Sequence, residues 1–216
     1  ADILLDNLPS AALSEPKNLR FKTGKRKKIW NKNCLSIGLA SGFMEPLEST
    51  SIHLIQSTIM RFFSLFPHKA DFEVEMNYFN NSIDEEFKSI RDFLILHYKL
   101  TTRDDSELWN YCRNMEIPDS LIEKLELYRS GSWIERNNKE LFGVDSWLAV
   151  LDGQNAQANS YNPLVDTLPE SELKKIMRDT REVLSQCASS MPDHEHFILN
   201  NCASKNHQLS SNQSAL

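Results

Sequence analysis

Residues 76–100 read MNYFNNSIDEEFKSIRDFLILHYKL, and this stretch decides the fold class. Apolar side chains recur in it at intervals of three and four, which places them along one face of a helix; they are Phe79, Ile83, Phe87, Ile90, Phe93 and Leu94, followed by His97. Acidic residues gather early and basic residues late, as a helix dipole favours. We therefore predict one long helix here.

Helices are also predicted on both sides of this stretch. A helix from Ser51 to Phe66 follows from the same periodicity and ends at Pro67, which cannot continue it. Capping and periodicity predict more helices downstream, at residues 106–114, 118–128, 171–187 and, as a short element, within 191–203. Glycine, proline and amide residues instead predict a long loop over residues 143–168, with one helical turn near Trp147. The polar tail 204–216 is predicted to be disordered.

The N-terminal part carries the only β signal. Residues 19–30, LRFKTGKRKKIW, predict a β-hairpin that turns at Thr23-Gly24. The basic run Lys25 to Lys28 is interpreted as a solvated strand edge. The apolar run from Cys34 to Leu39 predicts a further strand. The expected fold class is mainly α with a short β-hairpin near the N-terminus.

Composition narrows the possible functions. A formal charge of −6 and a pI near 5.6 leave no basic surface for nucleic acid. The four cysteines are widely separated and form no metal-ligand cluster, so we expect reduced thiols and no metal site. No apolar run reaches the length of a membrane span, and no signal peptide is recognised. We expect a cytoplasmic protein that contacts neither membrane nor nucleic acid.

The segment Gly38 to Ile52, GLASGFMEPLESTSI, is the candidate site. Glycines at 38 and 42 allow a tight turn and a close approach of the backbone to a ligand. The run Ser49-Thr50-Ser51 offers backbone N–H groups at a helix N-terminus, where an anion is stabilised. Ordinary helix capping with packed glycines remains an alternative on these residues alone.

Two carboxylates, Glu45 and Glu48, bracket Pro46-Leu47 in this segment. Proline stiffens the backbone between them, so that one carboxylate can be held at a fixed geometry while the other caps the helix or faces solvent. The residue pattern does not decide which carboxylate has which role.

A family resemblance extends this interpretation. Residues 38–56, GLASGFMEPLESTSIHLIQ, preceded by LRFKTGKRKKIWNKN, resemble the segment that marks flavin-dependent tryptophan halogenases, and weaker similarity continues to about Ala203. The resemblance implies the helical C-terminal part of a flavin-monooxygenase-type α/β enzyme. Residues 1–50 would then be the end of the flavin-binding region, and residues 51–203 a helical substrate-side domain.

The resemblance also implies roles for single residues. Glu48 falls on the catalytic acid beside the reacting substrate carbon, and Ser49 lies between that acid and the flavin. The backbone N–H groups of Thr50 and Ser51 fall on the halide site. Leu39 and Ile52 fall on positions that contact FAD, and Gly38 and Gly42 belong to the same cofactor-binding loop.

The implied chemistry is oxidation of chloride or bromide to hypohalous acid with O₂ and reduced FAD, which a separate flavin reductase supplies. The oxidant then passes to an essential lysine, and an aromatic substrate such as tryptophan or another indole is halogenated. A homodimer is a further possibility.

Three features depart from the family pattern. Ser51 stands where the free-tryptophan enzymes have glycine, and the region of their aromatic box offers only Trp147. The dinucleotide fingerprint G-x-G-x-x-G and the essential lysine belong to the family's N-terminal part and do not occur in these residues. We therefore expect a C-terminal fragment that binds no FAD tightly and is inactive alone. The alternative is a non-catalytic helical binding protein of halogenase ancestry.

Overall fold

The computed structural model describes residues 2–68, 71–136 and 140–202. The chain forms two compact units, Ala1–Tyr161 and Asn162–Leu216, which are described separately. The tail that is predicted to be disordered lies outside the described residues. The predicted division at residue 50, which concerns function, stays a prediction.

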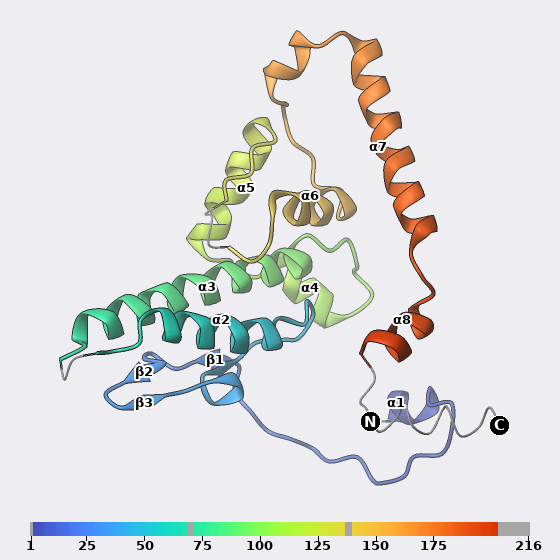
Figure 1. The fold of residues 1–216 in the computed structure, drawn as a ribbon. Helices are drawn as coiled ribbons and strands as arrows, with labels where there is room; N and C mark the ends of the chain where they lie inside the picture. The colour runs from blue at the N-terminus through green and yellow to red at the C-terminus, as the bar shows by residue number, and fades with distance from the viewer. Residues whose placement is uncertain (1, 69–70, 137–139, 203–216) are drawn as a thin grey trace. The chain divides into compact units, whose positions relative to one another are not determined.

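The first unit is built around one long helix, α3 (Figure 1). In chain order its helices are α1 (Asp2–Asp6), the 3₁₀ turn η1 (Gly38–Ala40), α2 (Thr50–Ser64), α3 (Glu73–Lys99), α4 (Glu107–Asn114), α5 (Asp119–Gly131) and α6 (Val144–Gly153). Its strands are β1 (Gly24–Lys25), β2 (Trp30–Asn31), β3 (Cys34–Leu35) and β4 (Gly42–Phe43). The mainly helical class is confirmed.

The predicted long helix is α3, and its apolar face is buried as the periodicity requires. Phe79, Ile83 and Ile90 have no exposed surface, and Phe93 retains only 2%. Full burial of a side chain of this size stabilises the fold by about 1.5–3 kcal/mol. This helix therefore anchors the whole unit.

A short hairpin is present near the N-terminus, but its predicted position is wrong. The hairpin is formed by β2 and β3, whose register pairs Trp30 with Leu35, and it turns through Lys32 at a φ of 55°. Gly24, expected at the turn, instead pairs with Phe43 in the antiparallel ladder of β1 and β4. The side chain of Asn80 on α3 fixes the hairpin: its Oδ1 accepts hydrogen bonds from the backbone N–H groups of Ile29 and Trp30 at 2.8 and 3.0 Å.

Two further predictions in this region need correction. The predicted strand from Cys34 to Leu39 is limited to β3, because Gly38, at a φ of 63°, turns the chain into η1. The basic run is not simply solvated: Lys25 forms an ion pair with Asp84, and Arg26 Nε donates to the Ala40 carbonyl at 2.6 Å.

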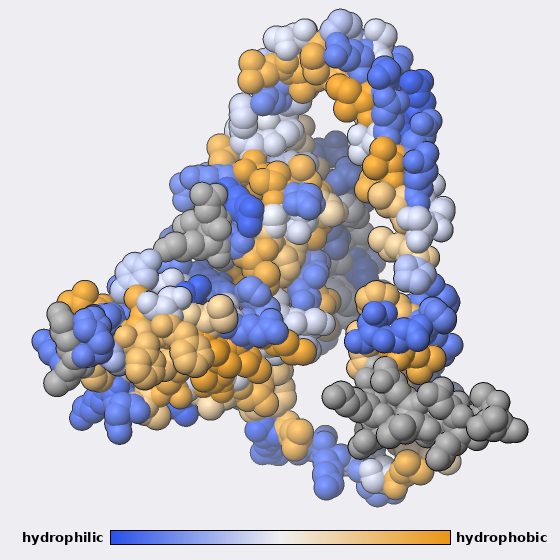
Figure 2. Space-filling model, in the orientation of Figure 1, coloured by the Kyte–Doolittle hydropathy of each residue, from blue (hydrophilic) through white to orange (hydrophobic). Residues whose placement is uncertain are grey.

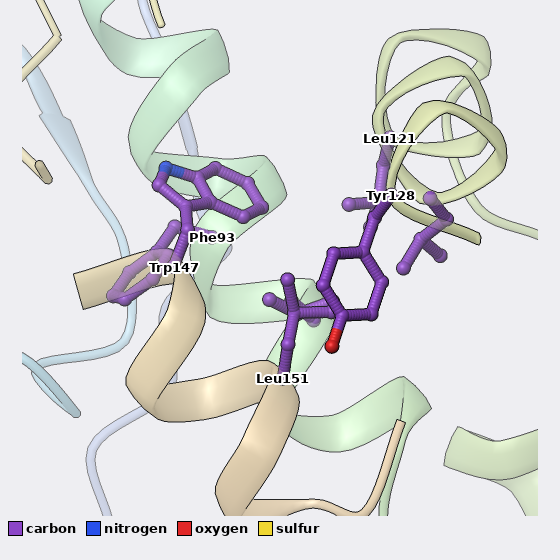
Figure 3. Close-up of a cluster of buried hydrophobic side chains, with 7 residues drawn as sticks. Phe93, Leu121, Tyr128, Trp147 and Leu151 are labelled. Carbon is purple, nitrogen blue, oxygen red and sulfur yellow. The ribbon is translucent and has the colours of Figure 1, made fainter. Parts of the chain in front are cut away.

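The loop predicted over residues 143–168 is also wrong, because it contains α6. Trp147 and Leu151 lie one turn apart on α6, and each is 2% exposed. They pack with Phe93, Leu121 and Tyr128 into a cluster between α3, α5 and α6 (Figure 3). Glycine residues flank this helix and had suggested a loop; they instead mark its ends.

The second unit contains η2 (Pro163–Thr167), α7 (Glu170–Ser190) and α8 (His194–Asn201). Both helices predicted after residue 170 are confirmed. Figure 2 shows hydrophobic residues along one side of α7 and hydrophilic residues along the other. None of the residues described in 162–202 is buried, so this amphipathic helix has no core of its own.

None of the helices in the described part of the chain combines the length and the apolar character that crossing a membrane requires.

Candidate functional site

The segment from η1 to the start of α2 brings most of the predicted site residues together. A hollow of about 50 Å³ has Gly38, Leu39 and Gly42, predicted to bind the cofactor, and Thr50 and Ser51, predicted to bind halide, in its lining. A volume of this size accommodates an ion or a water molecule but not a flavin ring.

The local structure explains why glycine occupies positions 38 and 42 in the hollow. Gly38 adopts a φ of 63°, a left-handed conformation that favours glycine. Gly42 lies so close to β1 that a Cβ atom would stand 2.8 Å from the Gly24 carbonyl oxygen and from the Lys25 Cα. Any larger residue would push the two strands apart. Their contact with a cofactor stays a prediction.

The N-terminus of α2 faces this hollow with Thr50 and Ser51. The first backbone N–H groups of a helix have no partner within it and attract anions. Within the part of the chain that the structure describes, no other hydrogen bond occupies the N–H groups of these two residues. Backbone donation does not depend on the side chain, so Ser51 in place of glycine is compatible with this role.

Ser49 connects the acidic loop to α2 in a strained conformation. Its φ and ψ of 52° and 32° are left-handed, which costs a non-glycine residue about 1–3 kcal/mol. Its N–H donates to the Pro46 carbonyl at 2.9 Å and closes a tight turn. The turn makes the chain change direction between Glu48 and Thr50.

Two exposed apolar side chains fit an aromatic cofactor ring: Leu39, which lines the hollow, and Ile52, which directly follows Ser51 in the chain. Leu39 and Ile52 are 76% and 69% exposed, and such side chains gain by covering a flat ring. The sequence contains no G-x-G-x-x-G motif for the dinucleotide part of FAD. The residues of this chain therefore fit contact with the flavin ring only.

The Glu48 carboxylate is paired with the last turn of α3. Its Oε1 lies 3.1 Å from Nε2 of His97. The other ring nitrogen of His97, Nδ1, lies 2.8 Å from the Phe93 carbonyl oxygen. Because a carbonyl oxygen only accepts, Nδ1 carries the proton in that hydrogen bond, and the ion pair with Glu48 requires a second proton on Nε2, so that both ring nitrogens donate. The Glu48 side chain remains 36% exposed, so it can still meet a ligand.

Glu45 is held by the neighbouring residue of α3. The Tyr98 hydroxyl donates a hydrogen bond to Glu45 Oε1. Burial, together with that hydrogen bond, raises the pKa of Tyr98 to about 12. The Tyr98 ring stacks on Trp109, over which the Arg103 guanidinium lies at 4.5 Å. Tyr98 is thus held from two sides.

A larger apolar cavity of about 830 Å³ lies on the Glu45 side of the loop, between the loop and helices α3 and α4. Its lining includes Phe43, Phe87, Leu94, Tyr98 and Tyr111, together with Glu45 and the basic residues Lys25, Lys88 and Arg91. Glu48 is not among the lining residues. The two carboxylates therefore face different environments although only two residues separate them.

A buried carboxylate, Glu86, fixes the beginning of α2 to α3. Its two oxygens lie 2.9 Å from His53 Nε2 and 2.8 Å from an Arg61 nitrogen. The Glu86 side chain is 5% exposed. A buried charge with partners on both oxygens fixes helix α2 against α3.

Trp147, the aromatic residue in the region of the family's aromatic box, is a core residue in this chain. Its ring packs edge-on against Phe93 with centroids 5.1 Å apart, and Lys124 Nζ lies 5.1 Å from its ring centre. At 2% exposure it is not available to contact a substrate.

Sequence reasoning missed His97, Tyr98 and Glu86 as parts of the site. His97 had been noticed only as the end of an apolar helical face, and its imidazole at that position was the one available signal. Glu86 stands in the acidic run DEEF, which gave no sign of burial.

Comparisons with known proteins show which family the chain is similar to. The tryptophan halogenase family model matches residues 1–170. A flavin-dependent halogenase from Xanthomonas campestris is 39% identical and superposes over 94% of this chain and 41% of its own, with a TM-score of 0.86. BrvH, a flavin-dependent halogenase from Brevundimonas sp. BAL3, is 36% identical over 90% of this chain and 40% of its own, with a TM-score of 0.81.

A curated relative, the tryptophan 6-halogenase ThaL of Streptomyces albogriseolus, is 39% identical over 118 residues, which are 55% of this chain and 22% of that protein. The chain thus spans about two fifths of the length of the solved halogenases and less of ThaL. The family match covers most of the chain, from residue 1 to residue 170. The chain belongs to the tryptophan halogenase family.

Proposed function

We propose that this chain supplies the acid and the halide end of the active site in a flavin-dependent halogenase that acts on an aromatic substrate of the tryptophan or indole type. The carrying observation is that Glu48, fixed by His97, directly precedes the unpaired N-terminus of α2 and the small hollow beside it. An acid and an anion site are thus separated by one turn of backbone.

The halide end uses the backbone. The N–H groups of Thr50 and Ser51 and the positive end of the α2 dipole attract chloride or bromide. The hollow has room for an ion of this size. Leu39 and Ile52 exclude water from its outer side once the flavin ring covers them.

Glu48 acts at the substitution step. When the aromatic ring carbon forms its bond to the electrophilic halogen, the bond from the halogen to the oxygen of hypohalous acid or to the nitrogen of the essential lysine breaks, and its electron pair leaves with that oxygen or nitrogen. The ring becomes cationic, and a fixed carboxylate stabilises that charge. Loss of the ring C–H proton, which Glu48 can accept, then restores aromaticity. Ser49 places this carboxylate and the halide site on opposite sides of a tight turn.

The cofactor and the partners follow from the family. Reduced FAD, delivered by a flavin reductase, supplies together with O₂ the oxidant that converts halide into hypohalous acid. Because Trp147 is buried and the aromatic box is otherwise absent, an indole other than free tryptophan is as compatible with this chain as tryptophan itself.

A hybrid protein tests the proposal. In the Xanthomonas campestris halogenase, the segment that this chain matches is replaced by residues 2–202 of this chain. The hybrid is supplied with a flavin reductase, NADH, FAD, O₂ and bromide, and halogenated indole is measured by mass spectrometry. We expect product from the hybrid and about a hundredfold to a thousandfold less from its Glu48→Gln variant.

The alternative is a non-catalytic binding protein. A folded hybrid that binds FAD but yields the same trace of product with and without Glu48 would favour that alternative. The 216-residue chain alone should bind no FAD tightly and halogenate nothing, which flavin fluorescence and the same product assay test.

A further inference from the structure

Helix α3 contacts the candidate site at two points of one face. Glu86 pairs with His53, just after the halide residues, and His97 pairs with Glu48, just before them. Eleven residues separate Glu86 from His97, which is close to three whole turns at about 3.6 residues per turn. One helix therefore holds both ends of the segment from Glu48 to His53.

His97 is itself immobilised from behind. Its Nδ1 is bonded to the Phe93 carbonyl at 2.8 Å, and its ring packs edge-on against the Phe93 ring with centroids 4.9 Å apart. Phe93 is buried and stacks on Phe142 at 3.9 Å and against Trp147 at 5.1 Å. The orientation of the imidazole is thus fixed by Phe93 and its aromatic neighbours, of which Figure 3 labels Phe93 and Trp147.

Glu48 has no comparable support of its own. It lies on a loop, it is one-third exposed, and among the described residues His97 is its only ion-pair partner. Without that partner, its side chain could rotate through several rotamers at little cost. A carboxylate that must face a reacting carbon cannot do so if its orientation is free.

We infer that His97 is a positioning residue for Glu48: its Nε2 holds the carboxylate at the orientation in which it faces the aromatic substrate. This inference rests on the proposed function and adds to it a residue that does not touch the substrate. Phe142 and Trp147, which pack against Phe93, then help to orient the acid through Phe93 and His97.

The first test is independent of catalysis and uses the 216-residue chain. The ¹⁵N resonances of the His97 ring are recorded for the native chain and for Glu48→Gln. We expect the Nε2 resonance to move in the variant while Nδ1, bonded to Phe93, stays in place. The exposed His68 serves as the internal control and should not move. An Nε2 resonance that is unchanged by Glu48→Gln would overturn the inference.

The second test uses two matched variants of the hybrid. In His97→Gln the amide nitrogen replaces Nε2 and still reaches Glu48; in His97→Asn it replaces Nδ1 and reaches only the Phe93 carbonyl. We expect His97→Asn to lower kcat for indole by about tenfold to a hundredfold, with KM nearly unchanged. His97→Gln should recover to within about threefold of the parent.

Further readouts separate positioning from stability. Hypohalous acid formed without indole should be equal in the parent and both variants, because the halide end is intact. A purely structural role predicts equal losses in both variants that follow their melting temperatures, and this result would overturn the inference. If the hybrid itself is inactive, the proposed function fails, and the ¹⁵N test alone decides whether His97 holds Glu48.

Discussion

Two carboxylates join α3 to the candidate site, and their environments differ: Glu86 is on α3 and pairs with α2, whereas Glu48 is on the loop and pairs with α3. Glu86 is 5% exposed and has partners on both oxygens, His53 and Arg61. Glu48 is 36% exposed and has His97 on one oxygen only. A carboxylate that is fully paired has no capacity left for a ligand, whereas a half-paired carboxylate is both oriented and accessible. The same helix thus builds one structural contact and one contact suited to chemistry.

The largest effect is expected from Glu86→Ala, which leaves Arg61 without its buried partner. Removing one member of a buried ion pair costs about 3–5 kcal/mol, and because Arg61 is partly exposed we expect about 3 kcal/mol of unfolding free energy. Urea denaturation of the 216-residue chain measures it. Glu85→Ala, at a highly exposed neighbouring position, is the control and should cost at most about 1 kcal/mol. Equal losses of unfolding free energy in Glu86→Ala and Glu85→Ala would show that Glu86 does not form a buried ion pair that stabilises the fold.

Glu48→Gln should lower turnover and leave the stability of the chain nearly unchanged, in contrast to Glu86→Ala. In the hybrid protein we expect turnover of the aromatic substrate to fall by about two to three orders of magnitude, because the charge that favours the transition state is lost. Flavin binding and halide oxidation should persist, and the melting temperature should change little, since an exposed pair contributes at most about 1 kcal/mol. Near-normal turnover for Glu48→Gln together with collapse for Glu45→Gln would reverse the assignment of the two loop acids.

A smaller effect is expected at the Glu45 contact. Tyr98→Phe removes the hydrogen bond to Glu45 and should lower the unfolding free energy by about 1 kcal/mol. Glu45→Gln keeps an acceptor for the Tyr98 hydroxyl and should cost less. Both variants are compared by urea denaturation, and their turnover in the hybrid should stay within a few-fold of the parent. A loss of activity as large as that of Glu48→Gln would place Glu45 in the reaction.

The smallest effect concerns pH. The pKa of Tyr98 is raised to about 12 in the folded chain, so the stability it contributes is fully present below the ordinary tyrosine pKa of about 10. That stability is lost as pH rises from about 10 through about 12. Absorbance of the phenolate should show a late-titrating component in the native chain that is lost in Tyr98→Phe. A native chain without this late component would show that Tyr98 is neither buried nor bonded to Glu45 as described.

The helices were predictable because their signal is local. The apolar face of α3 repeats every three to four residues, and the burial of Phe79, Ile83 and Ile90 follows directly from it. α6 was missed because Gly143 and Gly153 frame a ten-residue helix whose stability comes from the burial of Trp147 against Phe93, a contact between residues far apart in the chain. The hairpin was misplaced for the same reason, since Gly24 pairs with Phe43 and not with a neighbour.

The candidate site was predictable only in part. The glycines, the two loop acids and the helix N-terminus lie in one short segment, and the structure gathers Gly38, Gly42 and Thr50 around one hollow. The partners of the acids are about fifty residues away, at His97 and Tyr98, and nothing in a local pattern connects them. A single sequence therefore indicated where the acids are, but not what orients them.

The number of residues between Glu86 and His97 on α3 fixes the distance between the two points at which this helix contacts the site. At about 1.5 Å per residue, eleven residues set the two anchor points about 16 Å apart along the axis, whatever side chains lie between them on the outer face. Substitutions on that outer face would leave this length unchanged. One inserted or deleted residue would rotate His97 by about 100° relative to Glu86 and detach the acid from its anchor. The relative position of the two contacts therefore depends on the number of residues between Glu86 and His97 more than on the identity of those residues.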